Sequence, residues 1–440
     1  MTEAPAAQGV TRDQPPIRTL GSVLSSLDID GRMLGMTAAL AVIWLGFNYM
    51  SNGNFLTPRN LWNLSVQSSA IAILATGMVL IIVSRNIDLS LGSLMGFLGY
   101  VMAMVQAIWI PTTLHMGYEQ PFTWVVALAI GIALGALVGA IQGFIVAYGG
   151  VPAFIVTLGG FLVWRGLIFR FDQGQTVAPM DKTFQILGGA PGVGSAGEFW
   201  SWVIGLVACA AIVYSMFSSR RKRRAYGFPV RPTWAMATVM AIGCGAVLVG
   251  VWVANHYYLP AALATQYATD HGITEPPGGL LIPVGISWPV LLMIAVTLVM
   301  TILATRRRFG RYVFAIGGNP DAAELGGINV RRTIVGTFTL MGILCAISAA
   351  FLTARLNSAV TGAGVQSELY AIAAAVIGGT SFAGGIGTIP GAVLGAVVMQ
   401  SLQSGMAIVG VDSPTQDVIV GIVLVGAVFI DVAIRRRSAR

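Results

Sequence analysis

Residues 61–109 read LWNLSVQSSAIAILATGMVLIIVSRNIDLSLGSLMGFLGYVMAMVQAIW, two long apolar runs that flank the short polar segment SRNID at 84–88. Each run is long enough to cross a bilayer as an α-helix, which needs about 20 mostly apolar residues. The whole chain has this character, since 56% of its 440 residues are hydrophobic and only 10% are charged. Soluble domains carry roughly 25% charged residues. The composition excludes a soluble enzyme, a disordered scaffold and a nucleic-acid binder, and it predicts an all-α polytopic membrane protein.

Apolar segments of this kind recur along the chain between 33 and 435. The stretch around 367–395 is the weakest, because GGTSFAGGIGTIPG at 378–391 interrupts it. We expect about twelve transmembrane helices, with a range of 10–12, in one membrane domain at 33–435. The predicted spans are 33–50, 61–84, 89–109, 123–148, 152–171, 201–218, 234–256, 287–305, 333–354, 367–383, 388–410 and 416–434.

Lys and Arg residues set the expected orientation, because cytoplasmic loops carry an excess of them. Basic residues gather at 219–233, at 306–332 and after 434, whereas 110–122 and 257–286 contain neither Lys nor Arg. Twelve spans with cytoplasmic N and C termini place every basic cluster inside. We therefore predict cytoplasmic tails at 1–32 and 436–440, a basic cytoplasmic loop at 219–233 and an extracytoplasmic loop at 257–286.

Glycines at four-residue spacing mark helix faces that a neighbouring helix can approach closely. Gly131, Gly135, Gly139 and Gly143 form such a face in the fourth predicted span. The cysteines and histidines show no metal-ligand spacing, so we predict no metal site.

Two polar stretches are candidates for a translocation path. Asn60, Asn63 and Gln67 share one face of a predicted helix, where they either line a path for a hydroxyl-rich solute or form hydrogen bonds between helices. Thr380 and Ser381 belong to the irregular glycine-rich stretch at 378–391. That stretch is no nucleotide-binding loop, because neither Lys182 nor Lys222 follows a glycine and no Walker A motif exists.

The segment SRNIDLSLG at 84–92 places ionisable groups between two apolar spans almost without a loop. Such groups usually face the bundle interior with a partner, so Arg85 and Asp88 are candidates for an ion pair. A second interpretation is a discontinuous element whose exposed helix end faces a path, with Asn86, Asp88 and Ser90 as lining residues. In a third, Asp88 or Ser90 caps the next helix.

The cytoplasmic stretch RRRFGRYVFAIGGNPDAAELGGINVRR at 306–332 predicts one short, delimited helix. Asn319 is a good N-cap and Pro320 a good first helical residue. Asp321 and Glu324 favour the positive helix end. Gly326 can close the helix after Leu325. A rigid helix presented between two basic flanks suggests a docking site for a soluble partner.

Four stretches together resemble the permease subunits of ABC importers for monosaccharides, and most of all those for D-xylose. They are ATGMVLIIVSRNIDLSLGSLMG at 75–96, VPAFIVTLGGFLVWRGL at 151–167, GRYVFAIGGNPDAAELGGINV at 310–330 and AVIGGTSFAGGIGTIPGAVLGAVV at 375–398. The resemblance covers about 55–170 and 305–435. The segment 173–300 departs from the shorter family pattern by an extra pair of spans.

This resemblance implies a subunit of the bacterial inner membrane that is not itself an enzyme and holds no cofactor. ATP would be bound by a cytoplasmic ABC ATPase, seated on the coupling helix within 310–330. An extracytoplasmic sugar-binding protein would deliver the sugar, and a second permease copy would form a homodimer with this one. The alternative is a proton-coupled secondary sugar transporter with Asp88, Asp417 or Asp431 as the relay.

Overall fold

The computed structural model describes residues 31–190, 194–228, 230, 232–273 and 279–438. All secondary-structure elements in these residues are helices. The β-structure there is limited to isolated bridges, such as the one between Val177 and Ala359. Most of the predicted tail at 1–32, and the last two residues of the tail at 436–440, lie outside the described part. The predicted all-α polytopic membrane fold is confirmed.

Within the described ranges, ten helices are long and apolar enough to cross a membrane. They are α2 (Gly31–Met50), α3 (Pro58–Val83), α4 (Leu91–Met104) with its π-helical continuation η1 (Val105–Thr113), α5 (Thr123–Ala147), α6 (Ala153–Asp172), α8 (Gly197–Ala225), α9 (Thr233–Asn255), α11 (Trp288–Arg306), α14 (Val330–Leu356) and α16 (Ile389–Val409). The shorter elements are α7 (Lys182–Gln185), η2 (Ile186–Gly188), α10 (Ala261–His271), α12 (Arg308–Gly318), α13 (Pro320–Leu325) and α15 (Ser367–Ile377), and the chain ends in α17 (Ser413–Ser438).

The predicted span at 367–383 is wrong as a full helix. The helix found there, α15, has 11 residues, or about 16 Å of length at 1.5 Å per residue, roughly half of the hydrocarbon thickness. Gly378 and Gly379 end it, the latter with φ +91°, a conformation that favours glycine. The remainder, 378–388, is not helical. The structure does not confirm a count of twelve full spans.

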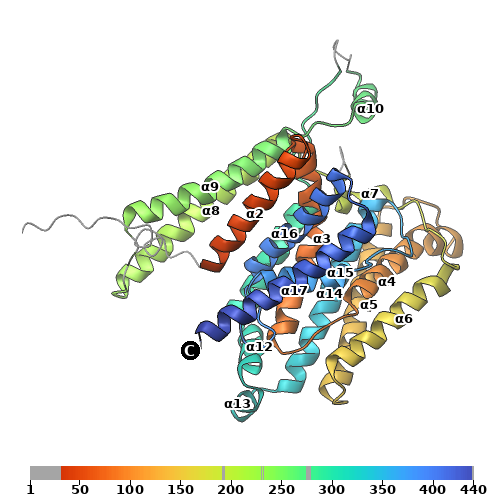
Figure 1. Ribbon diagram of the computed structural model, residues 1–440. Coiled ribbons are helices and arrows are strands. Elements are labelled where there is room, and N and C mark those ends of the chain that lie inside the picture. Colours follow the sequence, from red (N-terminus) through yellow and green to blue (C-terminus); the bar gives the residue numbers. More distant parts are fainter. Residues whose placement is uncertain (1–30, 191–193, 229, 231, 274–278, 439–440) are drawn as a thin grey trace, which may run out of the picture.

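The core of the bundle is formed by α3, α4, α14, α15 and α16 (Figure 1). Within the apolar window of α3, 83% of the residues are buried. The predicted glycine face is confirmed, because α5 packs along α14 through it. A Cβ on Gly143 would lie 2.9 Å from the Cα of Val335, and one on Gly139 would lie 2.9 Å from the carbonyl carbon of Phe338.

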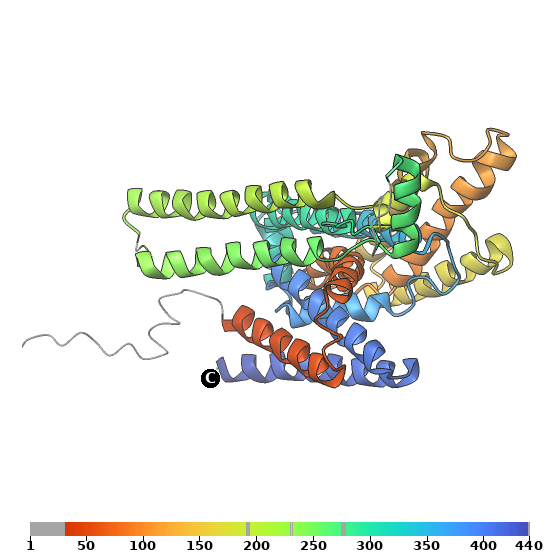
Figure 2. The same ribbon diagram turned by 90° about the horizontal axis from the view of Figure 1, so that it is seen from above.

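The extra pair of spans, α8 and α9, forms a long hairpin that stands apart from the core (Figures 1 and 2). Because α8 continues to Ala225, much of the predicted basic loop at 219–233 is helical. The predicted outer loop at 257–286 contains α10 and is anchored to α3, since the Nε1 of Trp62 donates to the carbonyl of Gly285 at 2.8 Å.

Several helix ends that the sequence predicts on one side of the membrane lie together in the structure. The turn of the hairpin, the start of α2 and the end of α17 lie at one end of the molecule in both views, and α10 lies at the opposite end (Figures 1 and 2). The sequence predicts that the first end is cytoplasmic.

Cysteine labelling tests this orientation at positions that the structure shows to be exposed. In a variant without Cys209, Cys244 and Cys345, we expect an impermeant thiol reagent to label Leu114→Cys and Leu281→Cys in intact cells. Tyr226→Cys and Leu325→Cys should react only after permeabilisation. All four side chains are exposed, so labelling of Leu325→Cys in intact cells would reverse the topology.

Candidate functional site

The predicted path residues fall into two separate groups. In the first, Gln67 of α3 accepts a hydrogen bond from the Nε2 of Gln400 on α16 at 2.9 Å, whereas Asn63 donates to the carbonyl of Arg59 on its own helix. Gln67 lies about 24 Å along α3 from Val83, at 1.5 Å per residue. The Gln67 contact matches the interpretation of hydrogen bonding between helices, whereas the Asn63 contact does not.

The second group is held by Asp88, which is 1% exposed. Its Oδ1 accepts from the backbone N–H of Ser90 at 2.8 Å and from the Oγ of Ser90 at 2.7 Å. The Nε2 of Gln142 on α5 donates to the same Oγ at 3.0 Å. The capping interpretation is not confirmed, because Ser90 precedes α4 without a side-chain cap hydrogen bond. Asp88 instead holds the turn before the helix, and a buried polar chain links it to α5.

The candidate ion pair between Arg85 and Asp88 is wrong. The Nε of Arg85 donates to the carbonyl of Gly317 at 2.8 Å, and its Nη2 donates to the carbonyl of Gly318 at 2.8 Å. These are the last two residues of α12. A cation is favourable at the C-terminal end of a helix, where the unpaired carbonyls carry partial negative charge.

The glycine-rich stretch 378–388 meets the same place. The backbone N–H of Gly385 donates to the carbonyl of Val83 at 3.0 Å. A Cβ on Gly384 would lie 2.5 Å from the Cγ of Arg85, and a Cβ on Gly317 would lie 2.5 Å from the backbone nitrogen of Gly385. We call the residues Val83, Arg85, Gly317, Gly318, Gly384 and Gly385 the inner junction.

The structure also places Thr380 and Ser381 beside this junction. Both are buried, and a Cβ on Gly387 would touch Val83 and Thr380 together. The Oγ of Ser381 accepts from the backbone of Ala383 at 3.2 Å, whereas the Oγ1 of Thr380 has no hydrogen-bond partner among the described residues. Asn86 is half-buried, and its Nδ2 donates to the carbonyl of Ser84 at 3.0 Å.

Glu368 is a buried polar residue that the sequence analysis did not identify. It lies at the start of α15, is 8% exposed, and its Oε2 has no hydrogen-bond partner in the described part of the chain. A Cβ on Gly92 would clash with this oxygen, so the first turns of α4 and α15 meet here. The sequence signal for this residue is a carboxylate inside an otherwise apolar segment.

The short helix predicted after Asn319 is present as α13, and its side of the membrane stays a prediction. The Oδ1 of Asn319 accepts from the backbone of Ala322 at 3.1 Å, Pro320 is the first helical residue, and the N–H of Gly326 closes the end on Ala322. Leu325 is 90% exposed. Arg85 binds the carbonyls of the last two residues of α12, and Asn319 alone separates α12 from α13.

Comparison with known proteins gives the family. The xylose transport system permease protein XylH of Escherichia coli (strain K12) is 37% identical over 417 residues, 95% of each chain. XylH of Haemophilus influenzae (strain ATCC 51907 / DSM 11121 / KW20 / Rd) is 36% identical over 402 residues, 91% of this chain and 96% of that one. The ribose import permease protein RbsC of Escherichia coli (strain K12) is 31% identical over 379 residues, 86% of this chain and 87% of that one.

No solved structure gives a significant match. A family model described as the permease component of the branched-chain amino acid transport system matches residues 60–428, which include the inner junction, α13 and Glu368. The chain therefore belongs to this family of membrane transport permeases, as a member similar to the xylose and ribose permeases.

Proposed function

We propose that this chain is the transmembrane permease subunit of an ABC importer, which moves a monosaccharide, a pentose such as xylose, across the bacterial inner membrane by alternating access. The observation that carries the proposal is the similarity to XylH along 95% of the chain. The partners are a cytoplasmic ABC ATPase that binds and hydrolyses ATP, an extracytoplasmic sugar-binding protein and a second permease copy.

The arrangement of α12 and α13 supports a mechanical role. An exposed helix with Leu325 at its end can dock into a partner, and α12 connects it to the inner junction. Arg85 lies two residues beyond the end of α3, and its two hydrogen bonds would carry a displacement of α12 to the breaks at 84–90 and 378–388. Those breaks, with Asp88, Ser90, Thr380 and Ser381, are where we place the inner part of the path.

The proton-coupled alternative has less support. The carboxylate of Asp88 already accepts two hydrogen bonds from Ser90, and Asp417 lies on an exposed face of α17. The side chain of Asp431 lies outside the described part. A relay would need an exchangeable carboxylate on a buried route, and neither described residue offers one.

The docking role of α13 is tested by the double variant Glu324→Lys and Leu325→Lys. Exposed substitutions typically change stability by no more than about 0.5 kcal/mol, so the protein should still insert. Charging a central anchor of an interface costs about 2 kcal/mol or more. We expect loss of co-purification with the ATPase and loss of sugar uptake in reconstituted vesicles.

Tyr226→Lys with Phe228→Lys is the control for that variant, because it adds two charges at exposed positions of the hairpin turn. It should retain the ATPase. Uptake driven by a proton gradient in vesicles that hold this chain alone would contradict the ABC assignment.

Arg85→Ala should separate docking from transport. Hydrogen bonds that involve a charged group contribute about 1.5–3 kcal/mol each, so loss of both should lower uptake at least tenfold while the ATPase still binds to α13. The Arg85→Lys variant cannot reproduce the forked pair of donors, so its uptake should fall between that of the parent and that of Arg85→Ala. Arg59→Ala, an exposed arginine at the other end of α3, is the control; normal uptake by Arg85→Ala would remove the mechanical role.

Two variants of Asp88 distinguish a hydrogen-bond acceptor from a proton relay. Asp88→Asn keeps a carbonyl oxygen for Ser90 and should retain most uptake. Asp88→Ala leaves the buried backbone N–H unpaired, which costs about 1–3 kcal/mol, and should lower both thermal stability and uptake. If both variants abolish uptake and both remain as stable as the parent, the relay becomes the better account.

A further inference from the structure

The cytoplasmic end of α8 carries its charges at one level of the membrane. Residues 200–219 contain no charged side chain, and RRKRR follows at 220–224. Twenty helical residues span about 30 Å, the thickness of the hydrocarbon. Arg220 therefore lies where the acyl chains end and the lipid phosphates begin.

Among the described residues, no carboxylate forms an ion pair with these cations. No Asp or Glu occurs between Glu198 and Asp270. Among the described residues, the one ion pair of the protein joins Lys182 to Glu119, far from the hairpin turn in sequence. Within the described part of the chain, the basic residues at 220–224 therefore remain available to an external anion.

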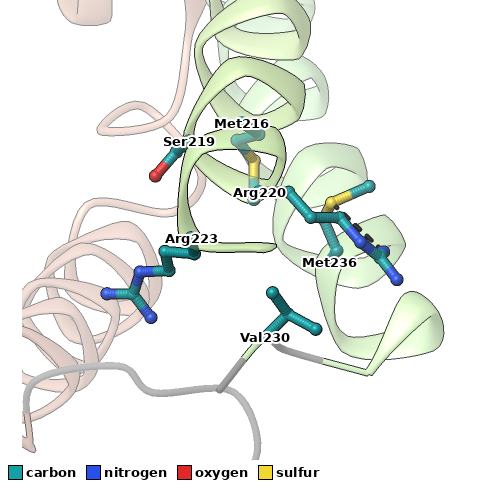
Figure 3. A pocket seen from close by; sticks show the side chains of 6 residues that line it. All are labelled: Met216, Ser219, Arg220, Arg223, Val230 and Met236. Carbon is teal, nitrogen blue, oxygen red and sulfur yellow. Dashed lines mark hydrogen bonds between the residues drawn. The ribbon is translucent and has the colours of Figure 1, made fainter. Parts of the chain in front are cut away.

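A cavity of about 140 Å³ lies between the end of α8 and the start of α9 (Figure 3). Its apolar wall comes from Met216, Val230 and Met236, and its polar side from Ser219, Arg220 and Arg223. Figure 3 shows Arg220 extending beside Met236, and its Nη1 contacts the Sδ at 3.6 Å. A thioether is a weak hydrogen-bond acceptor, so the guanidinium of Arg220 can still donate to a stronger acceptor such as a phosphate oxygen.

Arg220 has a position that the other basic residues of the cluster do not share. It is half-buried, whereas 221–224 are exposed. It lines this cavity and also a second one that it borders with Phe217, Arg221 and Arg224. Lys222 lines neither cavity, although it carries the same charge on the same turn of helix.

The surroundings of the cavity suit acyl chains. Tyr214 and Phe217 are exposed on α8 just before the basic residues, and aromatic side chains are typical of the membrane interface. The hairpin makes few contacts with the core, so these surfaces are open to lipid.

We propose that the cavity at the turn of the α8–α9 hairpin binds the phosphate of an anionic phospholipid, with Arg220 as the central ligand and the acyl chains along the exposed face of α8. Arginine binds phosphate oxygens through several donors at once, and cytoplasmic leaflets are rich in anionic lipids. A soluble phosphate would use the guanidinium but not the apolar wall. The proposal does not depend on the transported substrate or on the ATPase.

The test compares Arg220→Gln with Lys222→Gln in the full chain. Each protein is reconstituted in phosphatidylcholine nanodiscs containing a minor fraction of phosphatidylglycerol, and the retained lipid is counted by native mass spectrometry after gentle extraction. Loss of a charge-assisted hydrogen bond corresponds to about a tenfold weaker affinity. We expect Arg220→Gln to lose retained phosphatidylglycerol about tenfold, and Lys222→Gln to keep it.

Three outcomes would overturn the proposal. Equal losses in the two variants would mean that only the general positive charge of the hairpin attracts lipid. Unchanged retention in both would mean that no bound lipid depends on Arg220. Binding of inorganic phosphate by the parent, without retained phosphatidylglycerol, would assign the cavity to a soluble anion. Circular dichroism and size-exclusion profiles confirm that each variant is folded.

Discussion

Backbone groups inside a membrane must find partners within the protein, because the hydrocarbon offers none. This chain interrupts its helices at 84–90 and at 378–388, and hydrogen bonds tie both segments to their surroundings. The N–H of Gly385 donates to the carbonyl of Val83, and the carboxylate of Asp88 accepts a hydrogen bond from the N–H of Ser90. Arg85 then binds two carbonyls of α12. Hydrogen bonds thus hold both irregular segments in place at the ends of their helices.

Close approach is the second requirement of the same arrangement. Gly317, Gly384 and Gly385 lie so near to their neighbours that any side chain on Gly317 or Gly384 would displace the backbone or Arg85. Gly384 and Gly385 also have positive φ values, which glycine adopts without strain. The glycines of the inner junction are therefore needed for both shape and hydrogen bonding, whereas those of α5 serve helix packing alone.

The sequence predicts local features of this fold well and long-range partners poorly. Asn319, Pro320 and Gly326 are local signals, and α13 has the predicted bounds. The partner of Arg85 is 232 residues away, and a nearby Asp88 was the only candidate that spacing could offer. The sequence does not predict the short length of α15, because an apolar run looks the same whether its helix crosses the membrane fully or in part. Glu368 lies in that same run, so its burial depends on where α15 begins.

The core helices and the α8–α9 hairpin have different roles in the proposed mechanism. Five core helices share buried contacts, and a displacement at α12 reaches α3 directly through Arg85. The hairpin of α8 and α9 lies outside this network, and Ala254 near the end of α9 joins a buried cluster with Trp62 and Val66 of α3. A mechanical signal from α13 would therefore pass through the inner junction and bypass the hairpin. The uncompensated charge of 220–224 fits an anchoring role at the membrane surface, since positively charged residues there fix a helix against anionic lipid without constraining the core.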